Sequence, residues 1–323
     1  MGPLLEVNDL STHFNTEYGV VKAVDRVNLS VAEGAALGIV GESGCGKTVL
    51  ALSVMRLIPS PPGRIVSGNI FFKDTDIVRL DPSEMQKIRG KHISMIFQEP
   101  MTSLNPVLRI GDQITEIIRL HLGLGRKEAL SRAVETLVLV GMPSPETAML
   151  CYPHQMSGGM RQRVMIAMAI SCSPELMLAD EPTTALDVTI QAQILDLIGK
   201  LRKEIGMSVI LITHDLGVIA EAADNVAVMY TGQVVEYTSV ENLFGTPLHP
   251  YTVGLMESIP RIDGAEGRNE YLKVIRGVVP SLYDLPVGCT FQERCPHTMQ
   301  ICREVEPELK EYLPGHRVHC WLY

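Results

Sequence analysis

Short runs of apolar residues recur along the chain in the pattern expected for the strands of an α/β fold. Four of these runs are uninterrupted, as in strands covered on both faces, and they occupy residues 35–40, 92–98, 175–180 and 208–213. Alternating apolar and polar residues predict further strands within 4–38 and 67–77, antiparallel in the first case. Residues 227–238 predict a hairpin whose turn lies near Thr231 and Gly232.

The stretch between residues 107 and 172 has a helical periodicity instead. It predicts helices over 109–122, 127–141 and 160–170, within a helical subdomain of about residues 100–172. Beyond residue 240, proline, glycine and cysteine become more frequent. We therefore expect one large domain over 1–240 and a small, loop-rich carboxy-terminal extension over 241–323.

A glycine-rich stretch with the sequence GESGCGKT follows the first uninterrupted run and precedes a predicted helix over 49–58. Strand, glycine loop and helix form the context of a phosphate-binding loop, in which backbone N–H groups and the helix N-terminus face an anion. Lys47 can then reach the terminal phosphates, and the Thr48 hydroxyl can hold Mg²⁺. The predicted nucleotide-binding residues here are Gly41, Ser43, Gly44, Cys45, Gly46, Lys47 and Thr48.

Polar residues follow three of the other strands, namely Gln98, then Asp180 and Glu181, then His214. In open α/β sheets ligands bind beyond the carboxyl ends of the strands, so these side chains should converge beside the glycine loop. Each one alone has an ordinary alternative, as a capping glutamine, a solvated acid or a satisfied histidine. Ser157, Gly158 and Gly159 precede a predicted helix and form either an anion site or an ordinary helix N-cap.

Length, charge and hydropathy argue against several classes of protein. The 323 residues carry a formal net charge of −9, which argues against a dedicated nucleic-acid surface. The chain has no apolar stretch of 18 or more residues and no signal-peptide pattern at its N-terminus. We expect a location in the cytosol or at the cytoplasmic face of the cell membrane.

Five motifs in order resemble the ATPase subunits of ABC transporters over about residues 4–240: GESGCGKT, Gln98, MSGGMRQR, LMLADEPTTALD and His214. The stretches QEPMTSLNP and SGGMRQRVMIAMAI, followed by HPYT and four cysteines, are similar to the peptide/nickel permease branch. The resemblance implies a P-loop cassette with an amino-terminal antiparallel β subdomain and a helical insertion. It implies import of dipeptides or oligopeptides driven by ATP, with nickel and haem as alternative cargoes of the same branch.

The resemblance also assigns roles to matching residues. Lys47 and the loop amides would hold the β- and γ-phosphates, while Thr48, Asp180 and Gln98 would surround Mg²⁺. Glu181 would polarise the attacking water, His214 would contact the γ-phosphate, and Gln98 would sense the nucleotide and reach a membrane subunit through the loop after it. Tyr18, which spacing alone places in an ordinary hairpin, matches the aromatic that stacks on adenine. Asp187 matches a residue that communicates across the dimer.

In this family the signature of one subunit, here Ser157, Gly158 and Gly159, closes on the ATP of its partner in a head-to-tail dimer. The chain departs from the usual signature at Met156, where leucine is common, and at Met160, where glutamine is common. Methionine is nearly isosteric with leucine, so the first departure should matter little. The second is common in the peptide branch.

Four of the seven cysteines, Cys289, Cys295, Cys302 and Cys320, lie within the last 35 residues. Four thiolates suit zinc or an iron–sulfur cluster. The C-x₂₋₄-C pairs of structural zinc sites are absent from this spacing, which favours a 4Fe–4S cluster, and the resemblance agrees. Zinc and four unligated thiols remain alternatives.

The resemblance implies several partners: a second ABC ATPase, more readily a similar chain than an identical one, two membrane permease subunits and, indirectly, an extracytoplasmic substrate-binding protein. Nucleic acid is not expected. A competing class is the soluble ABC ATPases of translation and DNA repair, but these carry two ATPase units or long coiled-coil insertions, and this sequence shows one unit without sustained heptads. A non-catalytic partner subunit is disfavoured because both Glu181 and His214 are present.

Overall fold

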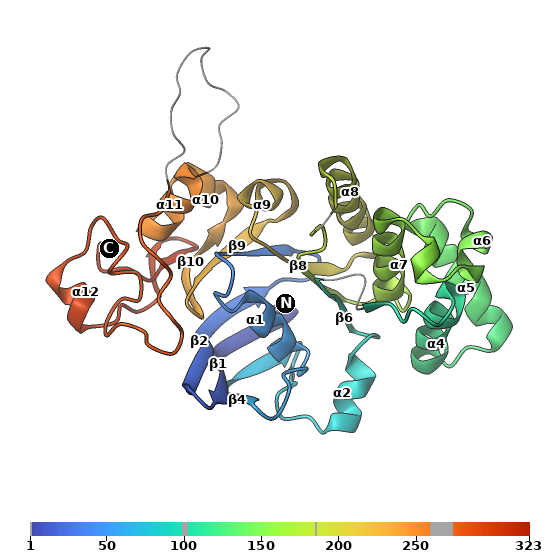
Figure 1. Cartoon of the computed structure of the whole chain (residues 1–323). Coiled ribbons are helices and arrows are strands. Elements are labelled where there is room, and N and C mark those ends of the chain that lie inside the picture. The colour runs from blue at the N-terminus through green and yellow to red at the C-terminus, as the bar shows by residue number, and fades with distance from the viewer. Residues whose placement is uncertain (1, 99–102, 185, 259–273) are drawn as a thin grey trace, which may run out of the picture. The chain divides into compact units, whose positions relative to one another are not determined.

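The computed structural model describes residues 2–98, 103–184, 186–258 and 274–323 (Figure 1). The chain folds as two compact units, each built from several segments. The first unit comprises Met1–Leu5, Val31–Ala36 and Phe71–Thr213, and the second comprises Glu6–Ser30, Leu37–Ile70 and His214–Tyr323. The predicted loop after Gln98 lies partly outside the described residues, at 99–102.

Three parallel strands form the centre of the first unit, in the order β6 (Ile93–Ile96), β7 (Leu176–Asp180) and β8 (Ser208–Thr213). Met95 pairs with Leu178, and Ala179 pairs with Leu211. All residues of β7 and β8 are buried, as the uninterrupted apolar runs predict for strands covered on both faces. The carboxyl ends of β6, β7 and β8 therefore lie at one edge.

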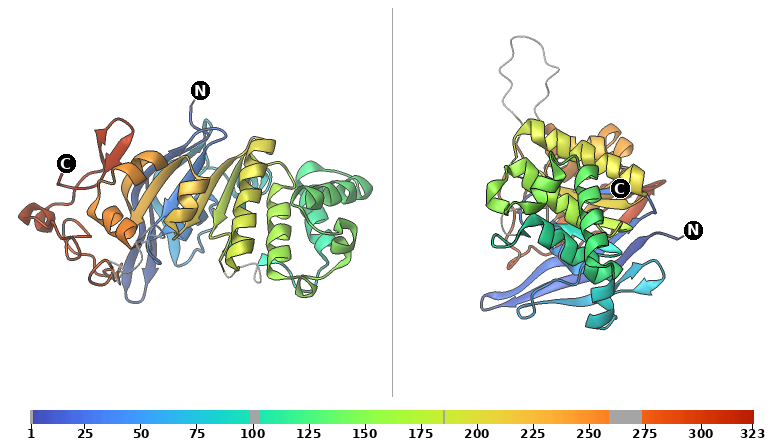
Figure 2. Two further views of the ribbon diagram at one scale, coloured as in Figure 1. Left: turned by 90° about the horizontal axis from the view of Figure 1, so that it is seen from above. Right: turned by 90° about the vertical axis from the view of Figure 1, so that its right-hand side faces the viewer.

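The predicted helices of this unit are confirmed as α4 (Ile110–Leu122), α5 (Arg126–Leu139) and α7 (Gly158–Ile170), joined by the shorter α6 (Pro145–Leu150) (Figures 1 and 2). The helix α2 (Pro82–Ile88) precedes β6. The helices pack through apolar side chains that are 0 % exposed: Ile114, Ile118, Ala133, Leu137 and Ile166. These side chains recur at helical spacing, which is why the sequence pattern identified their helices.

No element is predicted above for residues 188–205, yet they form α8 (Val188–Ile205), which at 18 residues is the longest helix in the described part of the chain. Its buried face has helical spacing and consists of Ile194, Leu197, Ile198 and Leu201. Asp187 caps its start by accepting a hydrogen bond from the Ile190 N–H at 3.0 Å. Gly206 follows its end in the left-handed conformation, with φ 75°.

The second unit holds the amino-terminal strands β1 (Leu5–Thr16), β2 (Gly19–Val31) and β4 (Gly63–Phe72), in the order β2-β1-β4. The short β5 (Thr75–Asp76) belongs to the first unit, where it pairs with Phe71 and Phe72 at the end of β4. A second sheet has the order β11-β12-β10-β9-β3, with β3 (Ala36–Val40) parallel to β9 (Asn225–Tyr230). β9 and β10 (Gln233–Ser239) form the predicted hairpin, and its turn has positive φ at Thr231 and Gly232.

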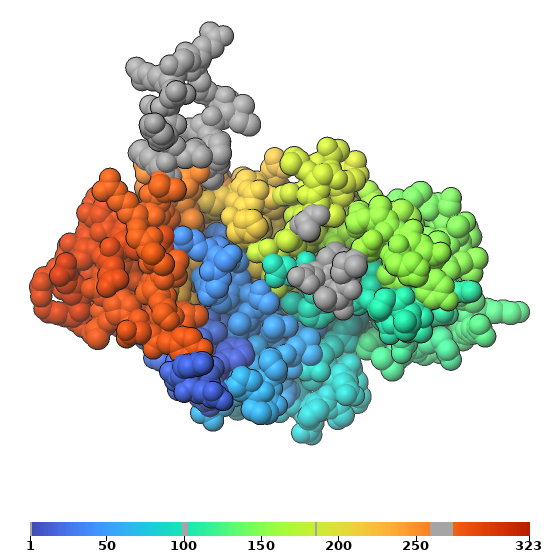
Figure 3. Space-filling view, in the orientation of Figure 1, coloured from blue at the N-terminus to red at the C-terminus, as the bar shows by residue number. Residues whose placement is uncertain are grey.

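Helices and a carboxy-terminal hairpin complete the second unit. The helices are α1 (Lys47–Val54), α9 (Leu216–Ala222), α10 (Val240–Gly245), α11 (Pro250–Glu257) and α12 (Gln300–Glu304). The hairpin of β11 (Lys310–Leu313) and β12 (His316–Val318) joins the second sheet, because β12 pairs with β10. The carboxy-terminal residues form one orange-to-red surface beside the blue amino-terminal strands (Figure 3). Among the described residues, no helix has the length and apolar character needed to cross a bilayer.

A buried polar network fixes the start of the carboxy-terminal extension. Glu236 on β10 is 0 % exposed and accepts hydrogen bonds from the backbone N–H groups of Leu248 and His249, at 2.8 and 2.9 Å. His316 Nε2 lies 2.7 Å from the same carboxylate. His249 Nδ1 accepts from the Tyr251 N–H at 3.0 Å and so caps α11. Burial lowers the pKa of His249 to about 3, so the ring is neutral at neutral pH.

The lowered pKa of His249 predicts that acid destabilises the fold. The unfolded chain takes up a proton as the pH falls below 6.5, whereas the folded chain resists protonation until about pH 3, so stability falls across that window. Asparagine at this position can still cap α11. We therefore expect His249→Asn to reduce the loss of unfolding free energy between about pH 7.5 and 5.5 by about 1 kcal/mol, measured by urea unfolding.

His154 is exposed, so His154→Asn provides a matched control and should leave the pH dependence unchanged. An identical pH dependence in the unchanged protein and in His249→Asn would contradict the assignment.

Candidate functional site

The predicted phosphate-binding loop lies between β3 and α1 in the second unit. Some of its side chains are buried and others are exposed to solvent. Cys45 and Lys47 are buried, whereas Ser43 and Thr48 are exposed. Lys47 Nζ donates to the carbonyl oxygens of Gly41 and Glu42, at 2.7 and 3.1 Å. The loop therefore has an outer face lined by hydroxyl groups, with an ammonium group held within it.

Close backbone contacts hold the loop in shape. Gly46 has φ 101°, and a Cβ atom there would lie 2.1 Å from the Ala23 carbonyl oxygen on β2. Only glycine avoids both the strained conformation and this collision. The Gly232 N–H, in the β9–β10 turn, donates to the Cys45 carbonyl at 2.9 Å. Burial raises the pKa of the Cys45 thiol, which therefore remains neutral.

Tyr18 lies at the tip of the two-residue turn between β1 and β2, and it is 86 % exposed. Its neighbour is Tyr283 of the carboxy-terminal extension, with ring centroids 6.4 Å apart and planes at 86°. Tyr283 was not a predicted site residue, and nothing in its local sequence marks it. The two rings offer apolar faces on which a planar ligand can stack.

The first unit brings together Gln98, which follows β6, and Glu181, which follows β7. Gln98 Nε2 donates to Glu181 Oε2 at 3.2 Å, and Thr184 Oγ1 donates to the same oxygen at 2.9 Å. Glu181 has φ 44°, in the left-handed region, while its N–H donates to the Ile212 carbonyl on β8 at 2.9 Å. Asp180, the last residue of β7, is 1 % exposed. Glu181 is therefore fixed at the strand edge by three contacts, two to its carboxylate and one from its backbone N–H.

The signature residues begin α7. Ser157 is its N-cap, and the Ser157 Oγ accepts from the Met160 N–H at 3.3 Å. Ser157 and Gly158 are exposed, whereas Met156 is 3 % exposed and belongs to the core, as expected for a substitute for leucine. The helix start thus presents small residues and a positive dipole end at the surface.

The predicted site is divided between the units. Gln98, Asp180, Glu181, the signature and Asp187 belong to the first unit, whereas Tyr18, the glycine loop and His214 belong to the second. The convergence of His214 with Glu181, and of the loop with Asp180, therefore stays a prediction. Asp187 is the N-cap of α8, a structural role that its sequence context permits.

All four carboxy-terminal cysteines are free thiols in the second unit. Burial raises the pKa values of Cys295 and Cys320, and that of Cys289 to about 11, and each shift is increased by one or more of the other thiols. Cys302 is 7 % exposed, and its carbonyl accepts from the Cys289 N–H at 2.8 Å. The thiols thus influence one another electrostatically, but within the described ranges no three His, Cys, Asp or Glu side chains are grouped closely enough to hold a metal ion.

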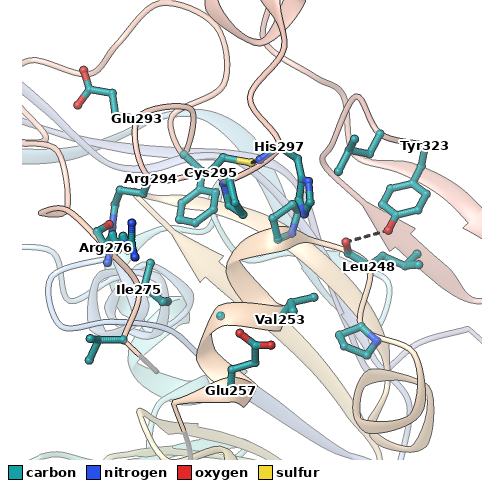
Figure 4. Close-up of a pocket in the computed structure, with 17 residues that line it drawn as sticks. Leu248, Val253, Glu257, Ile275, Arg276, Glu293, Arg294, Cys295, His297 and Tyr323 are labelled. Atoms are coloured by element: carbon teal, nitrogen blue, oxygen red, sulfur yellow. Dashed lines mark hydrogen bonds between the residues drawn. The ribbon is translucent and has the colours of Figure 1, made fainter. Parts of the chain in front are cut away.

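A pocket of about 540 Å³ lies in the extension, between α11 and the segment around Arg294 and Cys295 (Figure 4). Tyr323 closes one side of it by donating to the Leu248 carbonyl at 3.1 Å. No residue of the phosphate-binding loop lines it.

The extension reaches the loop through contacts that the sequence did not reveal. Arg294 forms an ion pair with Glu42, the second residue of the loop, and Tyr251 accepts a hydrogen bond from the Glu42 N–H at 2.9 Å. Both partners are far from Glu42 in the sequence: Arg294 lies 252 positions after it, and Tyr251 lies 209 positions after it. The only local signal is the HPY tripeptide that contains Tyr251.

Comparisons with known proteins agree with these features. The profile of the ABC transporter family matches residues 24–184, and that of the oligopeptide/dipeptide transporter C-terminal region matches residues 235–302. The oligopeptide transport ATP-binding protein AppD of Bacillus subtilis is 52 % identical over 100 % of this chain and 98 % of its own. The dipeptide transport ATP-binding protein DppD of Haemophilus influenzae is 50 % identical over 98 % of this chain and 94 % of its own.

The fold also has solved counterparts. The ATP-binding cassette MJ0796, in a dimeric structure described as a post-hydrolysis state bound to ADP and Pi, superposes with a TM-score of 0.66 at 27 % identity. That alignment covers 73 % of this chain and 98 % of MJ0796. The predicted cassette fold, with its β subdomain and helical region, is thereby confirmed. The chain therefore belongs to the ABC transporter family, as an ATP-hydrolysing subunit that carries the carboxy-terminal region of the oligopeptide and dipeptide transporters.

Proposed function

We propose that this chain powers the import of dipeptides or oligopeptides through membrane permease subunits. The observation that carries the proposal is the full-length similarity, at about half of all positions, to subunits named for peptide transport. The similarity includes the extension as well as the cassette. Nickel and haem are the alternative cargoes within this branch, and no feature of the described residues favours them.

The loop geometry supports Mg·ATP as the bound nucleotide. The N-terminus of α1 and the loop N–H groups would face the β- and γ-phosphates, with Lys47 turning from its carbonyl partners toward them. Thr48, Asp180 and Gln98 would surround Mg²⁺, which supplies charge neutralisation between the phosphates. Tyr18 would stack on adenine, and its 86 % exposure leaves the ring available.

For hydrolysis, we assign Glu181 to orient and polarise the attacking water. Its carboxylate is held by Gln98 and Thr184, so it is preorganised at the strand edge. His214 would contact the γ-phosphate. Catalysis of this kind depends on positioning and charge stabilisation more than on covalent chemistry.

The remaining half of each site would come from a partner ATPase. The exposed start of α7, with Ser157, Gly158 and Gly159, would close on the partner's ATP, and Asp187 would communicate across that dimer. A related but different ATPase is the partner that we favour. The assembly would dock on two permease subunits at the cytoplasmic face of the membrane and receive cargo from an extracytoplasmic binding protein.

For the four thiols we propose a 4Fe–4S cluster rather than a zinc ion, because their spacing in the sequence lacks the C-x₂₋₄-C pairs of structural zinc sites. Zinc binds thiolates at about 2.3 Å in a tetrahedron, which brings the sulfur atoms to about 4 Å from one another. The four thiols influence one another electrostatically, but among the described residues no three His, Cys, Asp or Glu side chains are placed to hold a metal ion. We assign such a cluster a structural or regulatory role and no step in hydrolysis.

Replacement of Glu181 tests the catalytic assignment. Glutamine keeps the size and the hydrogen-bonding oxygen but cannot act as a base. We expect Glu181→Gln to bind ATP within about threefold of the original affinity and to lose about 10²- to 10⁴-fold in kcat. Glu204→Gln, at an exposed position on α8, is the matched control. Near-normal ATPase activity in Glu181→Gln would remove Glu181 from its role.

The cargo can be tested by uptake. In cells that lack this chain, we expect the uptake of labelled dipeptides or oligopeptides to fall at least about tenfold and to return with the original chain but not with Glu181→Gln. Nickel and haem uptake measured in the same cells should be unchanged. Unaltered peptide uptake together with lost nickel or haem uptake would assign the chain to the alternative cargo.

The cysteine site can be tested by metal content and absorbance. Chain purified without oxygen should be brown, absorb near about 400 nm and contain about four irons per chain. Cys302→Ser should remove the absorbance band, whereas Cys151→Ser, outside the cluster, should keep it. A colourless protein with one zinc per chain would overturn the cluster assignment. A protein without bound metal would also overturn it and would show that the four thiols are unligated.

A further inference from the structure

The second residue of the phosphate-binding loop, Glu42, is held by an arginine from the far end of the chain. Arg294 Nη1 lies 2.6 Å from Glu42 Oε2, and Nη2 lies 3.0 Å from Oε1. This is the two-point geometry in which an arginine–carboxylate pair is strongest. The Arg294 side chain is 4 % exposed and that of Glu42 is 30 % exposed, so water screens the pair only in part.

The remaining contacts of Arg294 fix its guanidinium group. Its Nε donates to the Arg276 carbonyl at 3.2 Å, and its Nη1 also reaches the Tyr230 hydroxyl at 3.4 Å. Figure 4 shows Arg294 beside Arg276. The guanidinium group is therefore held in place before it meets Glu42, and little side-chain entropy is lost in forming the pair.

The backbone of Glu42 is held from the same side. Tyr251 is 0 % exposed, and its hydroxyl accepts from the Glu42 N–H at 2.9 Å. Its ring packs against Tyr230 at 4.7 Å and against Phe291 at 5.5 Å, measured between centroids. Both the main chain and the side chain of Glu42 thus depend on the extension.

The negative charge of Glu42 matters for nucleotide binding, and its ion pair with Arg294 offsets that charge. The loop is built to face phosphate groups, and an uncompensated carboxylate on its second residue would repel them at short range. Lys47 cannot compensate Glu42 while it serves the phosphates. The guanidinium group of Arg294 cancels the carboxylate charge in a partly buried place, where such a charge acts most strongly.

We propose that Arg294 is a positioning residue for ATP, which neutralises Glu42 and thereby makes the nucleotide affinity of the loop depend on the carboxy-terminal extension. Arg294 directly precedes Cys295. The residue that tunes the loop is therefore next to the four-thiol site, although the proposal holds whatever those thiols bind. The proposal depends only on ATP binding, which is expected because the chain belongs to the ABC transporter family.

The test is a charge-rescue cycle with Arg294→Met, Glu42→Gln and the double variant. We expect Arg294→Met to raise the Kd for ATP about tenfold, measured by titration with a fluorescent ATP analogue and by competition with ATP. At saturating ATP, kcat should change by less than about threefold. Glu42→Gln alone should keep the Kd within about threefold, because its amide oxygen still accepts from Arg294 and no carboxylate remains to be neutralised.

The double variant is decisive, since Glu42→Gln should return the Kd of Arg294→Met to within about threefold of the original. Rescue from a position 252 residues away is not expected if Arg294 merely stabilises the extension. Arg303→Met, at an exposed position on α12, is the matched control and should leave the Kd unchanged.

Three results would overturn the proposal: an unchanged Kd in Arg294→Met, a double variant as weak as Arg294→Met, or a Glu42→Gln variant as weak as Arg294→Met. If Arg294→Met does not fold, as judged by its thermal melt, Arg294→Lys takes its place. Lysine keeps the charge but lacks the planar fork, so we expect a smaller rise in Kd, again removed by Glu42→Gln. A Kd for Arg294→Lys that Glu42→Gln does not restore would equally refute the proposal.

Discussion

The structure depends on holding the backbone of one glycine-rich loop in a fixed shape between β3 and α1. The glycines carry no side chains, so the loop is held through its main chain. The loop is held by main-chain contacts with three neighbours: the Ala23 carbonyl against Gly46, the Gly232 N–H on the Cys45 carbonyl, and the Tyr251 hydroxyl on the Glu42 N–H. A shift of the loop would displace a strand, a turn and a helix together, so the anion-binding shape exists before the ligand arrives.

The same requirement explains why the extension is packed so firmly. Buried Glu236 holds the start of the HPY segment, and the Thr231 hydroxyl donates to that of Thr290 at 2.8 Å. On the other side, Glu306 receives hydrogen bonds from Arg26 and Gln233. A buried carboxylate is costly unless every partner is present, so this network specifies one arrangement of the extension. Tyr251 and Arg294 are then delivered to the loop in fixed positions.

Local patterns predicted a large part of this molecule. Uninterrupted apolar runs identified β6, β7 and β8, and because parallel strands share one edge, the meeting of Gln98 with Glu181 could be inferred from where their strands end. The helix α8 lies outside the predicted elements, although its apolar residues have helical spacing and Asp187 is its N-cap. The Arg294–Glu42 pair has no local signature, since it joins two segments that only the folded second unit brings together.

The strained backbone conformation of Glu181 orients its carboxylate at the edge of the sheet. A residue other than glycine with φ 44° costs about 1 kcal/mol or more, and such a cost persists only where the surroundings impose it. Here the N–H is tied to Ile212 while the carboxylate is tied to Gln98 and Thr184, so the main chain and the side chain are fixed independently. Relaxing the backbone would break the first contact and swing the carboxylate away from the other two. The left-handed turn is therefore what aims the carboxylate across the ends of β6 and β7, and glycine, which would remove the strain, would also remove the group being aimed.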